Sequence, residues 1–175
     1  PVINVAGSAA KVILEPPLIV NAVMEKISPL IPIVTEQTTC GVIGYGAIGK
    51  ALTRKLLEMG HKVMVYDKET SCFDKKSMPK GIAVTNDLSS IVAFATCIFG
   101  CTGDDVSASL DPFRLSTHPK ILISCSSGDN EFQRLLKYIQ KTSKKTGEQF
   151  DPTESIHYTS DLGAKGTISK GVTPA

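Results

Sequence analysis

The sequence lacks both a long hydrophobic run and a surplus of either charge. No apolar stretch approaches the ~20 residues that a helix needs to cross a bilayer, and we find no signal-peptide pattern. The 19 basic side chains are scattered and nearly balanced by 17 acidic ones, which leaves a net charge of +2. We therefore expect no nucleic-acid partner and no membrane partner, and we expect a cytoplasmic protein.

The sequence also lacks the cysteine spacing of a disulfide framework or a zinc site. Its five cysteines are an odd number and include no C-x-x-C pair, and three of them lie within or beside apolar runs: Cys40, Cys72, Cys97, Cys101 and Cys125. We expect free thiols in a reducing compartment and no metal site.

The clearest positive signal is a glycine-rich motif between an expected strand and an expected helix. A β-branched and apolar run at 39–43 predicts a buried strand, and the apolar spacing over 47–59 predicts a helix. The G-x-G-x-x-G pattern lies between them. Gly44 suits a tight turn, Gly46 lets the backbone approach a pyrophosphate, and Gly49 lets the helix pack closely on the strand. The helix N-terminus offers N–H groups to an anion.

A second expected strand at 61–66 ends at Asp67, which lies 23 positions after Gly44. A carboxylate at this place can bind the ribose hydroxyls of a dinucleotide. Lys68 follows, but the negative charge of Asp67 should repel a 2′-phosphate. The pattern therefore favours NAD over NADP as the cofactor.

The rest of the chain alternates strands and helices. Further strands are expected at 81–85, 96–100 and 120–124, and helices at 88–93, 110–116 and, capped by Asp129 or Asn130, over 132–139. The stretch 68–80 predicts a loop with one poor helical turn. This pattern predicts an α/β fold, a Rossmann-type doubly wound parallel sheet of order 3-2-1-4-5 with helices on both faces. Its ligand crevice should lie between the first and fourth strands.

The sequence divides into three regions. An N-terminal helix and linker are expected at 1–38, with Pro16-Pro17 opening the helix. The Rossmann domain follows at 39–145. A C-terminal tail at 146–175 either folds back on the sheet or begins an adjoining segment. The chain starts without Met and ends without a capping element, so we expect a domain excised from a longer chain.

The carboxyl ends of the expected strands collect the candidate cofactor residues. Thr102-Gly103 and Ser126-Ser127 should lie under the nicotinamide half of NAD, and the glycine motif and Asp67 under the other half. The full set of candidates is Gly44, Tyr45, Gly46, Ala47, Ile48, Gly49, Asp67, Thr102, Gly103, Ser126 and Ser127. The sequence identifies no catalytic base.

Three motifs together resemble the NAD-binding domain of the adenosylhomocysteinase family: residues 44–50 (GYGAIGK), 98–103 (IFGCTG) and 123–128 (ISCSSG). The resemblance covers about residues 1 to 140. It implies a tightly held NAD that oxidises a ribose 3′-hydroxyl, with a substrate domain that this chain lacks. The family's catalytic lysine and aspartate precede the Rossmann unit, roughly where Lys11 and Glu15 stand, although Pro16 replaces the asparagine that follows.

The same plan is similar to the D-2-hydroxyacid dehydrogenases, whose INTSRG segment resembles residues 123–128. Ser127 stands at the position of their substrate-binding arginine. His118 precedes the fifth strand, and His157 is late enough in the chain to correspond to their catalytic histidine. Both resemblances imply hydride transfer to a small-molecule substrate that the sequence does not identify. The sequence leaves open whether the protein forms a homo-oligomer. The alternative is a non-catalytic NAD(H)-sensing or regulatory module.

Overall fold

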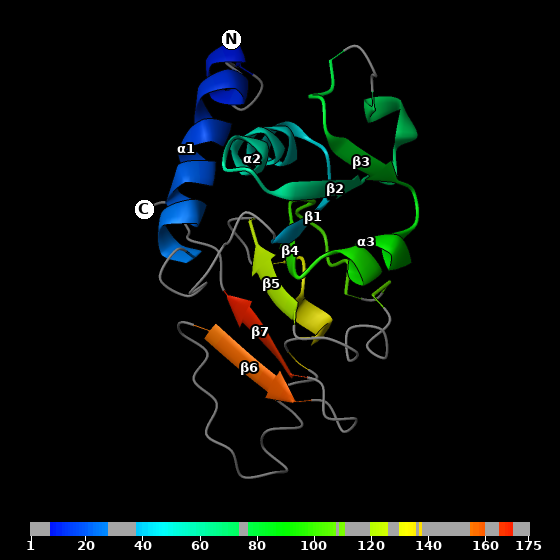
Figure 1. Ribbon diagram of the computed structural model, residues 1–175. Helices are drawn as coiled ribbons and strands as arrows, with labels where there is room; N and C mark the ends of the chain where they lie inside the picture. Colours follow the sequence, from blue (N-terminus) through cyan, green and yellow to red (C-terminus); the bar gives the residue numbers. More distant parts are fainter. Residues whose placement is uncertain are drawn as a thin grey trace.

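The protein is described by a computed structural model at residues 8–27, 38–73, 77–107, 109–110, 120–125, 130–135, 137, 155–159 and 165–169. A twisted sheet with helices against it forms the frame (Figure 1). Its helices are α1 (Ala9–Ile27), α2 (Ala47–Glu58) and α3 (Leu88–Phe94), with a 3₁₀ turn η1 (Thr70–Cys72). The strands are β1 (Thr39–Ile43), β2 (Lys62–Tyr66), β3 (Ile82–Thr85), β4 (Cys97–Gly100), β5 (Lys120–Ser124), β6 (Ser155–Thr159) and β7 (Lys165–Ser169).

The sheet confirms the Rossmann-type prediction. Its strands lie in the order β3-β2-β1-β4-β5-β7-β6, and the first five are parallel in the predicted order. Because the chain moves outward from β1 to β2 and β3 and then returns to β4 on the other side, the switch point lies between β1 and β4. Open α/β sheets bind ligands at the carboxyl ends of the strands beside such a point.

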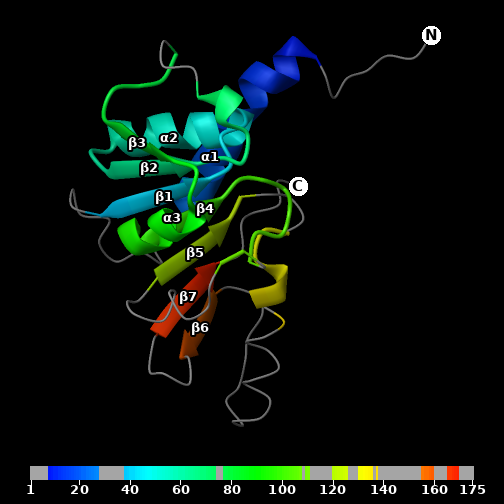
Figure 2. The same cartoon turned by 90° about the vertical axis from the view of Figure 1, so that its right-hand side faces the viewer.

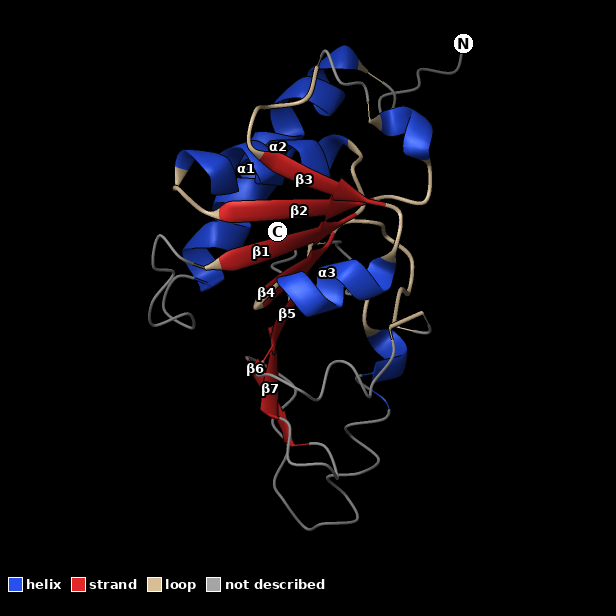
Figure 3. Cartoon of the chain, turned by 45° about the vertical axis from the view of Figure 1, so that its right-hand side comes forward, coloured by secondary structure: helices blue, strands red, loops and turns tan. Residues whose placement is uncertain are grey.

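Two apolar layers separate the sheet from its helices, and Figure 3 shows α1 and α2 on one face and α3 on the other. One layer joins Val20 and Val23 of α1 and Leu52 of α2 to buried strand residues such as Val42. The other joins Ile91 of α3 to buried strand residues of the opposite face. Continuous burial on both faces explains why β1 and β4 read as apolar runs rather than as alternating patterns.

The region 146–175 contributes two strands that extend the sheet beyond β5. β7 pairs with β5 in parallel, and β6 pairs antiparallel with β7 at the edge (Figures 1 and 2). His157 lies in β6, in register with Thr167 of β7. The sequence left open whether this region folds back on the sheet, and the strand pairing shows that these two segments do.

The predicted start of α1 was wrong. The helix begins at Ala9, and Pro16 and Pro17 lie in its interior. Ser8 provides the cap, because its hydroxyl accepts the N–H of Lys11 at 3.2 Å and its carbonyl accepts the N–H of Val12 at 3.1 Å. A proline has no N–H to give to the residue four positions earlier. The packing of the following turns on α2 and the sheet holds the helix together across this gap.

The expected helix α3 forms, and Asp87 is its N-cap. The carboxylate of Asp87 accepts the N–H groups of Ser89 and Ser90 at 3.0 and 3.1 Å and the hydroxyl of Ser90 at 2.8 Å. The Ser90 hydroxyl above all, and then the backbone N–H of Ser89, holds the pKa of Asp87 below its ordinary value. The other short helix expected at 110–116 falls largely outside the described residues.

We expect Asp87→Ala to lower the melting temperature at neutral pH because the first turn of α3 loses its cap. A carboxyl group with a folded pKa below its unfolded value stabilises the fold above the unfolded pKa, and this contribution disappears as pH falls through the folded pKa. The difference in melting temperature between wild type and variant should therefore shrink below about pH 4. Thermal unfolding followed by circular dichroism at several pH values measures it. A constant difference down to about pH 2 would contradict the cap's ionic character.

Candidate cofactor site

The glycine motif forms a tight turn between β1 and α2. Gly44 has a φ of +98°, the left-handed region that favours glycine, and its N–H donates to the carbonyl of Tyr66 at 2.8 Å. A Cβ at Gly44 would lie 2.9 Å from the backbone of Cys101 and 2.9 Å from the methyl group of Thr102. The segment after β4 therefore packs directly on the turn after β1, at the switch point.

The third glycine of the motif brings α2 against this turn. A Cβ at Gly49 would lie 1.9 Å from the carbonyl oxygen of Gly44. No real Cβ can approach an oxygen so closely. Gly49 thus fixes where the first turn of α2 lies relative to β1, as its position in the motif predicts.

The N-terminus of α2 has the features of an anion site. Its N-cap, Gly46, has no side chain to accept the N–H groups of the first turn, and that turn contains no acidic residue. Apart from its chain neighbours, no atom of the described residues lies within 4 Å of the place where a Cβ of Gly46 would stand, so the backbone is open to a ligand. The ammonium of Lys50, in the same turn, lies 5.5 Å from the centre of the Tyr45 ring. These N–H groups and the helix dipole fit a pyrophosphate.

Asp67 stands at the carboxyl end of β2, as predicted, and its carboxylate is oriented by the backbone. Oδ2 accepts the N–H of Tyr45 at 2.6 Å, and Oδ1 accepts the N–H of Glu69 at 2.9 Å. Each carboxylate oxygen has a second lone pair. Asp67 can therefore accept a hydroxyl group from a ribose while it ties the end of β2 to the glycine turn.

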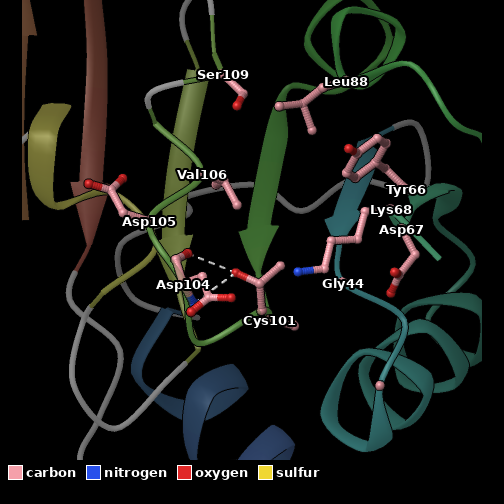
Figure 4. Close-up of a pocket in the computed structure, with 12 residues that line it drawn as sticks. Gly44, Tyr66, Asp67, Lys68, Leu88, Cys101, Asp104, Asp105, Val106 and Ser109 are labelled. Carbon is pink, nitrogen blue, oxygen red and sulfur yellow. Dashed lines mark hydrogen bonds between the residues drawn. The ribbon is translucent and has the colours of Figure 1, made fainter.

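A pocket of 380 Å³ opens at this edge of the sheet. Figure 4 shows residues that follow β2 on one side and residues that follow β4 on the other. On the second side, the hydroxyl of Thr102 donates to the carbonyl of Asp104 at 2.8 Å and accepts its N–H at 3.2 Å, which shapes the wall. The lining residues include Gly44, Gly46, Tyr66, Asp67, Lys68, Leu88, Cys101, Thr102, Asp104, Asp105, Val106 and Ser109.

Four of the predicted cofactor residues line this pocket: Gly44, Gly46, Asp67 and Thr102. The others have different places. Ala47, Ile48 and Gly49 form the first turn of α2, and Gly103 follows Thr102 with a φ of +74°. The Tyr45 side chain is buried against Phe73, with ring centres 5.6 Å apart, and burial raises the pKa of its hydroxyl. Ser126 and Ser127 lie outside the described residues.

The structure also brings residues to the site that the sequence did not single out. Leu88, the first residue of α3, and Val106 give the pocket apolar surface. Glu131, fully buried, binds the backbone behind the wall that follows β4. The sequence signals for these residues are weak, because each is an ordinary residue at the start of a helix or in a loop. Only their proximity to the carboxyl ends of strands could have indicated them.

Two other residues that the sequence offered as candidates, both on α1, do not line this pocket. Lys11 and Glu15 form an exposed ion pair on α1, with Nζ 3.7 Å from Oε2, as expected for a surface pair at i, i+4. The five cysteines are free thiols. A hydrogen bond with Cys125, together with burial, holds the pKa of Cys101 well above its ordinary value. Among the described residues, no group of His, Cys, Asp and Glu could hold a metal ion.

None of the helices in the described part of the chain combines the length and the apolar character that a membrane crossing requires.

Comparison with solved structures shows which fold this chain resembles. A D-isomer specific 2-hydroxyacid dehydrogenase from Lactobacillus delbrueckii ssp. bulgaricus, solved with NAD, superposes with a TM-score of 0.56 over 72% of this chain and 45% of that chain, at 21% identity. An imine reductase from Pseudomonas sp. gives a TM-score of 0.45 over 63% of this chain and 38% of that one, at 21% identity. The dehydrogenase therefore shares the fold, which the sequence motifs indicated. The likeness to adenosylhomocysteinase stays a prediction.

Curated relatives occur in two strains of Mycobacterium tuberculosis. Both are uncharacterised proteins that are 32% identical to this chain over 133 residues, or 75% of its length. The chain spans only 24% of the length of these relatives.

A family model described as "NADP oxidoreductase coenzyme F420-dependent" matches residues 39–128, the segment from β1 past β5 that contains the glycine turn, Asp67 and the pocket. With this match over more than half of the chain and with the geometry above, the protein belongs to that family and is an NAD(P)-binding, oxidoreductase-like domain.

Proposed function

We propose that this chain is the NAD(H)-binding domain of an oxidoreductase that transfers hydride to or from a small-molecule substrate. One observation carries the proposal. Asp67 and Gly46, the N-cap of α2, line the same pocket, and the Asp67 carboxylate is bound to the glycine turn. In dinucleotide-binding folds a carboxylate binds the ribose hydroxyls, and the glycine backbone and the helix N-terminus bind the pyrophosphate.

The preference for NAD over NADP rests on the charge and fixed position of Asp67. The two backbone hydrogen bonds hold its carboxylate beside the glycine turn. A 2′-phosphate on the adenosine ribose would bring a second negative charge to this point, and the repulsion costs binding free energy. The family's description names NADP. We give more weight to Asp67, since it is a local feature of this chain.

A bound nicotinamide ring would supply the hydride chemistry, and the chain would bind and orient it. The uncapped N–H groups of α2 hold the diphosphate, and Leu88 and Val106 exclude water from the apolar part of the pocket. The described residues of the pocket include no histidine. We infer that a longer polypeptide supplies the substrate-binding and proton-transferring groups, in an arrangement like that of adenosylhomocysteinase or of the D-2-hydroxyacid dehydrogenases.

Calorimetric titration of the 175-residue chain with NAD, NADH, NADP and NADPH tests the proposal. We expect saturable binding of NAD and NADH, and affinity at least about tenfold lower for the phosphorylated pair. Equal or tighter binding of NADP and NADPH would contradict the assigned role of Asp67. A lack of binding by all four would contradict the proposed function.

A non-catalytic NAD(H)-sensing module is the alternative. The serine at position 127, where the similar dehydrogenases carry a substrate-binding arginine, favours it. An assay of a longer polypeptide that contains this segment would distinguish the enzyme from the sensor. Turnover of NADH with any of a panel of 2-oxo acids or imines supports the enzyme, whereas tight NADH binding without turnover supports the sensor.

A further inference from the structure

A fully buried carboxylate lies behind the pocket wall that follows β4. Glu131 is 0% exposed, and its Oε1 accepts the backbone N–H of Gly103 at 3.0 Å. Its Oε2 accepts the hydroxyl of Ser124, the last residue of β5. Its own carbonyl accepts the N–H of Val106 at 2.9 Å. One residue thus binds the segment 101–106 at two points and ties it to the end of β5.

The peptide groups of Gly103 are held on both sides. Glu131 accepts its N–H, and the side-chain amide of Asn130 donates to its carbonyl at 3.3 Å. Gly103 has a φ of +74°, so the turn that these bonds fix is one that other residues rarely adopt. A Cβ at Gly100 would lie 2.7 Å from the Cβ of Glu131, so the glycine at the end of β4 makes room for the glutamate.

This clamp connects directly to the proposed cofactor site. Thr102, next to Gly103, lines the pocket and presses its methyl group on Gly44. The N–H of Cys101 donates to the carbonyl of Ile43 at 2.8 Å, so this segment is also bound to the end of β1. A shift of the Gly103 peptide would therefore move one wall of the pocket relative to the glycine turn. In the described part of the chain, the buried carboxylate and the side-chain amide next to it bind that peptide group from behind.

Burying a carboxylate costs free energy that an apolar side chain would not cost. Glu131 and Phe132 both lie against Gly100, and Phe132 belongs to an apolar layer, in which an apolar side chain carries no such cost. What the carboxylate adds is two acceptor atoms, one for Gly103 and one for Ser124. These two hydrogen bonds indicate that Glu131 serves to position the segment that it binds rather than to stabilise the fold.

We propose that Glu131 is a positioning residue of the cofactor site, which fixes the Gly103 peptide and so sets the distance between the wall at 102–106 and the glycine turn. It acts through the backbone of Gly103. The proposal rests on the proposed function, because it takes the pocket to be where NAD binds.

Three variants of the full chain test it. Glu131→Ala removes both acceptors. In Glu131→Gln, the amide oxygen can accept from Gly103 and the amide nitrogen can donate to Ser124, since a hydroxyl accepts as well as donates. Leu135→Ala is the control, because this side chain is 8% exposed in the same segment and packs in the apolar layer. It should lower stability without removing a bond to Gly103.

The readouts are the melting temperature, the dissociation constant for NAD measured well below it, and hydrogen exchange of residues 101–107. For Glu131→Ala we expect NAD binding about tenfold weaker and faster exchange in that segment. Glu131→Gln should stay within about twofold of wild type in affinity. Leu135→Ala should melt at lower temperature and keep wild-type affinity and exchange.

Wild-type affinity in Glu131→Ala, or an equal loss in Leu135→Ala, would overturn the positioning role while leaving wild-type NAD binding and the proposed function intact. If the wild type itself does not bind NAD, the proposed function falls and the cofactor role of Glu131 falls with it. If Glu131→Ala does not fold, Asn130→Ala removes the other bond to Gly103 from a partly exposed side chain. It should weaken NAD binding two- to threefold, roughly the effect of one neutral hydrogen bond, and unchanged affinity and exchange there would overturn the proposal.

Discussion

We expect Gly49→Ala to lower the free energy of unfolding by about 3 kcal/mol or more and to abolish dinucleotide binding. The added Cβ would lie 1.9 Å from the carbonyl oxygen of Gly44, so α2 and the glycine turn must separate. By helix propensity alone, alanine would stabilise a helix relative to glycine by about 1 kcal/mol. The expected change in stability therefore has the opposite sign to the change that helix propensity alone would give. Chemical denaturation and thermal unfolding measure it, with an expected fall in melting temperature of about 10 °C.

Gly46→Ala is the matched control for this variant. It adds the same methyl group three residues earlier, where φ is −72° and where, chain neighbours aside, nothing in the described part of the protein lies within 4 Å of the new Cβ. We expect this variant to fold with nearly wild-type stability. It should nonetheless bind NAD at least about tenfold more weakly, because the methyl group occupies the space that the diphosphate requires. A Gly49→Ala variant with wild-type stability, or a Gly46→Ala variant with wild-type affinity, would contradict the geometry of the turn.

The second large effect is expected at Asp67. Asp67→Ala removes the acceptor of two backbone N–H groups and the proposed partner of the ribose hydroxyls. Hydrogen bonds to charged groups contribute roughly 1.5–3 kcal/mol each, so we expect the affinity for NAD to fall by about 10- to 100-fold. The affinity for NADP should fall less or rise, because the repulsion of the 2′-phosphate disappears at the same time. Calorimetry with both nucleotides gives the ratio.

Two further variants separate charge from hydrogen bonding at this site. Asp67→Asn keeps one acceptor oxygen without the charge, so it should discriminate less against NADP while it retains part of the NAD affinity. Glu58→Gln removes one negative charge from an exposed residue at the opposite end of α2 and should change neither affinity. If the ratio of NAD to NADP affinity is the same in wild type and Asp67→Ala, then Asp67 does not determine the choice of cofactor.

The sequence predicted the part of the fold in which local signals and topology agree. β1 and α2 could be recognised because a buried strand, three glycines with separate steric roles and an amphipathic helix follow one another without a gap. Asp67 could be placed because it ends the next strand. The predicted order of five strands followed from right-handed crossovers, which allow few arrangements.

The start of α1 could not be predicted from the rule that proline favours the first turn of a helix. The Ser8 cap and the burial of the later turns of α1 against α2 outweigh that rule, so the helix begins at Ala9. The two strands β6 and β7 were missed because their residues include few apolar side chains. The pairing of β7 with β5 depends on contacts far apart in the sequence, and β6 joins the sheet only through β7.

Glu131 could not be recognised as a site residue for a related reason. In the sequence it is one glutamate near the start of an apolar helix pattern, where a carboxylate commonly faces water. Its burial depends on Gly100 at the end of β4, which leaves room for the Cβ of Glu131. Such a pairing is visible only when β4 and the segment after β5 lie side by side.

Amide-resolved NMR of the isotope-labelled chain during titration with NAD tests the central claim most directly. The claim is that the dinucleotide lies across the glycine turn with its diphosphate at the N-terminus of α2. We predict that the largest shifts occur at the amides of Gly46, Ala47 and Ile48, with further shifts at Thr102 and Gly103. Another cavity, lined by residues of α1 and α2, also includes Gly46 and Ala47. Shifts at Val12, Ile13 and Arg54 of that cavity, without shifts at Thr102 and Gly103, would contradict the proposed binding mode.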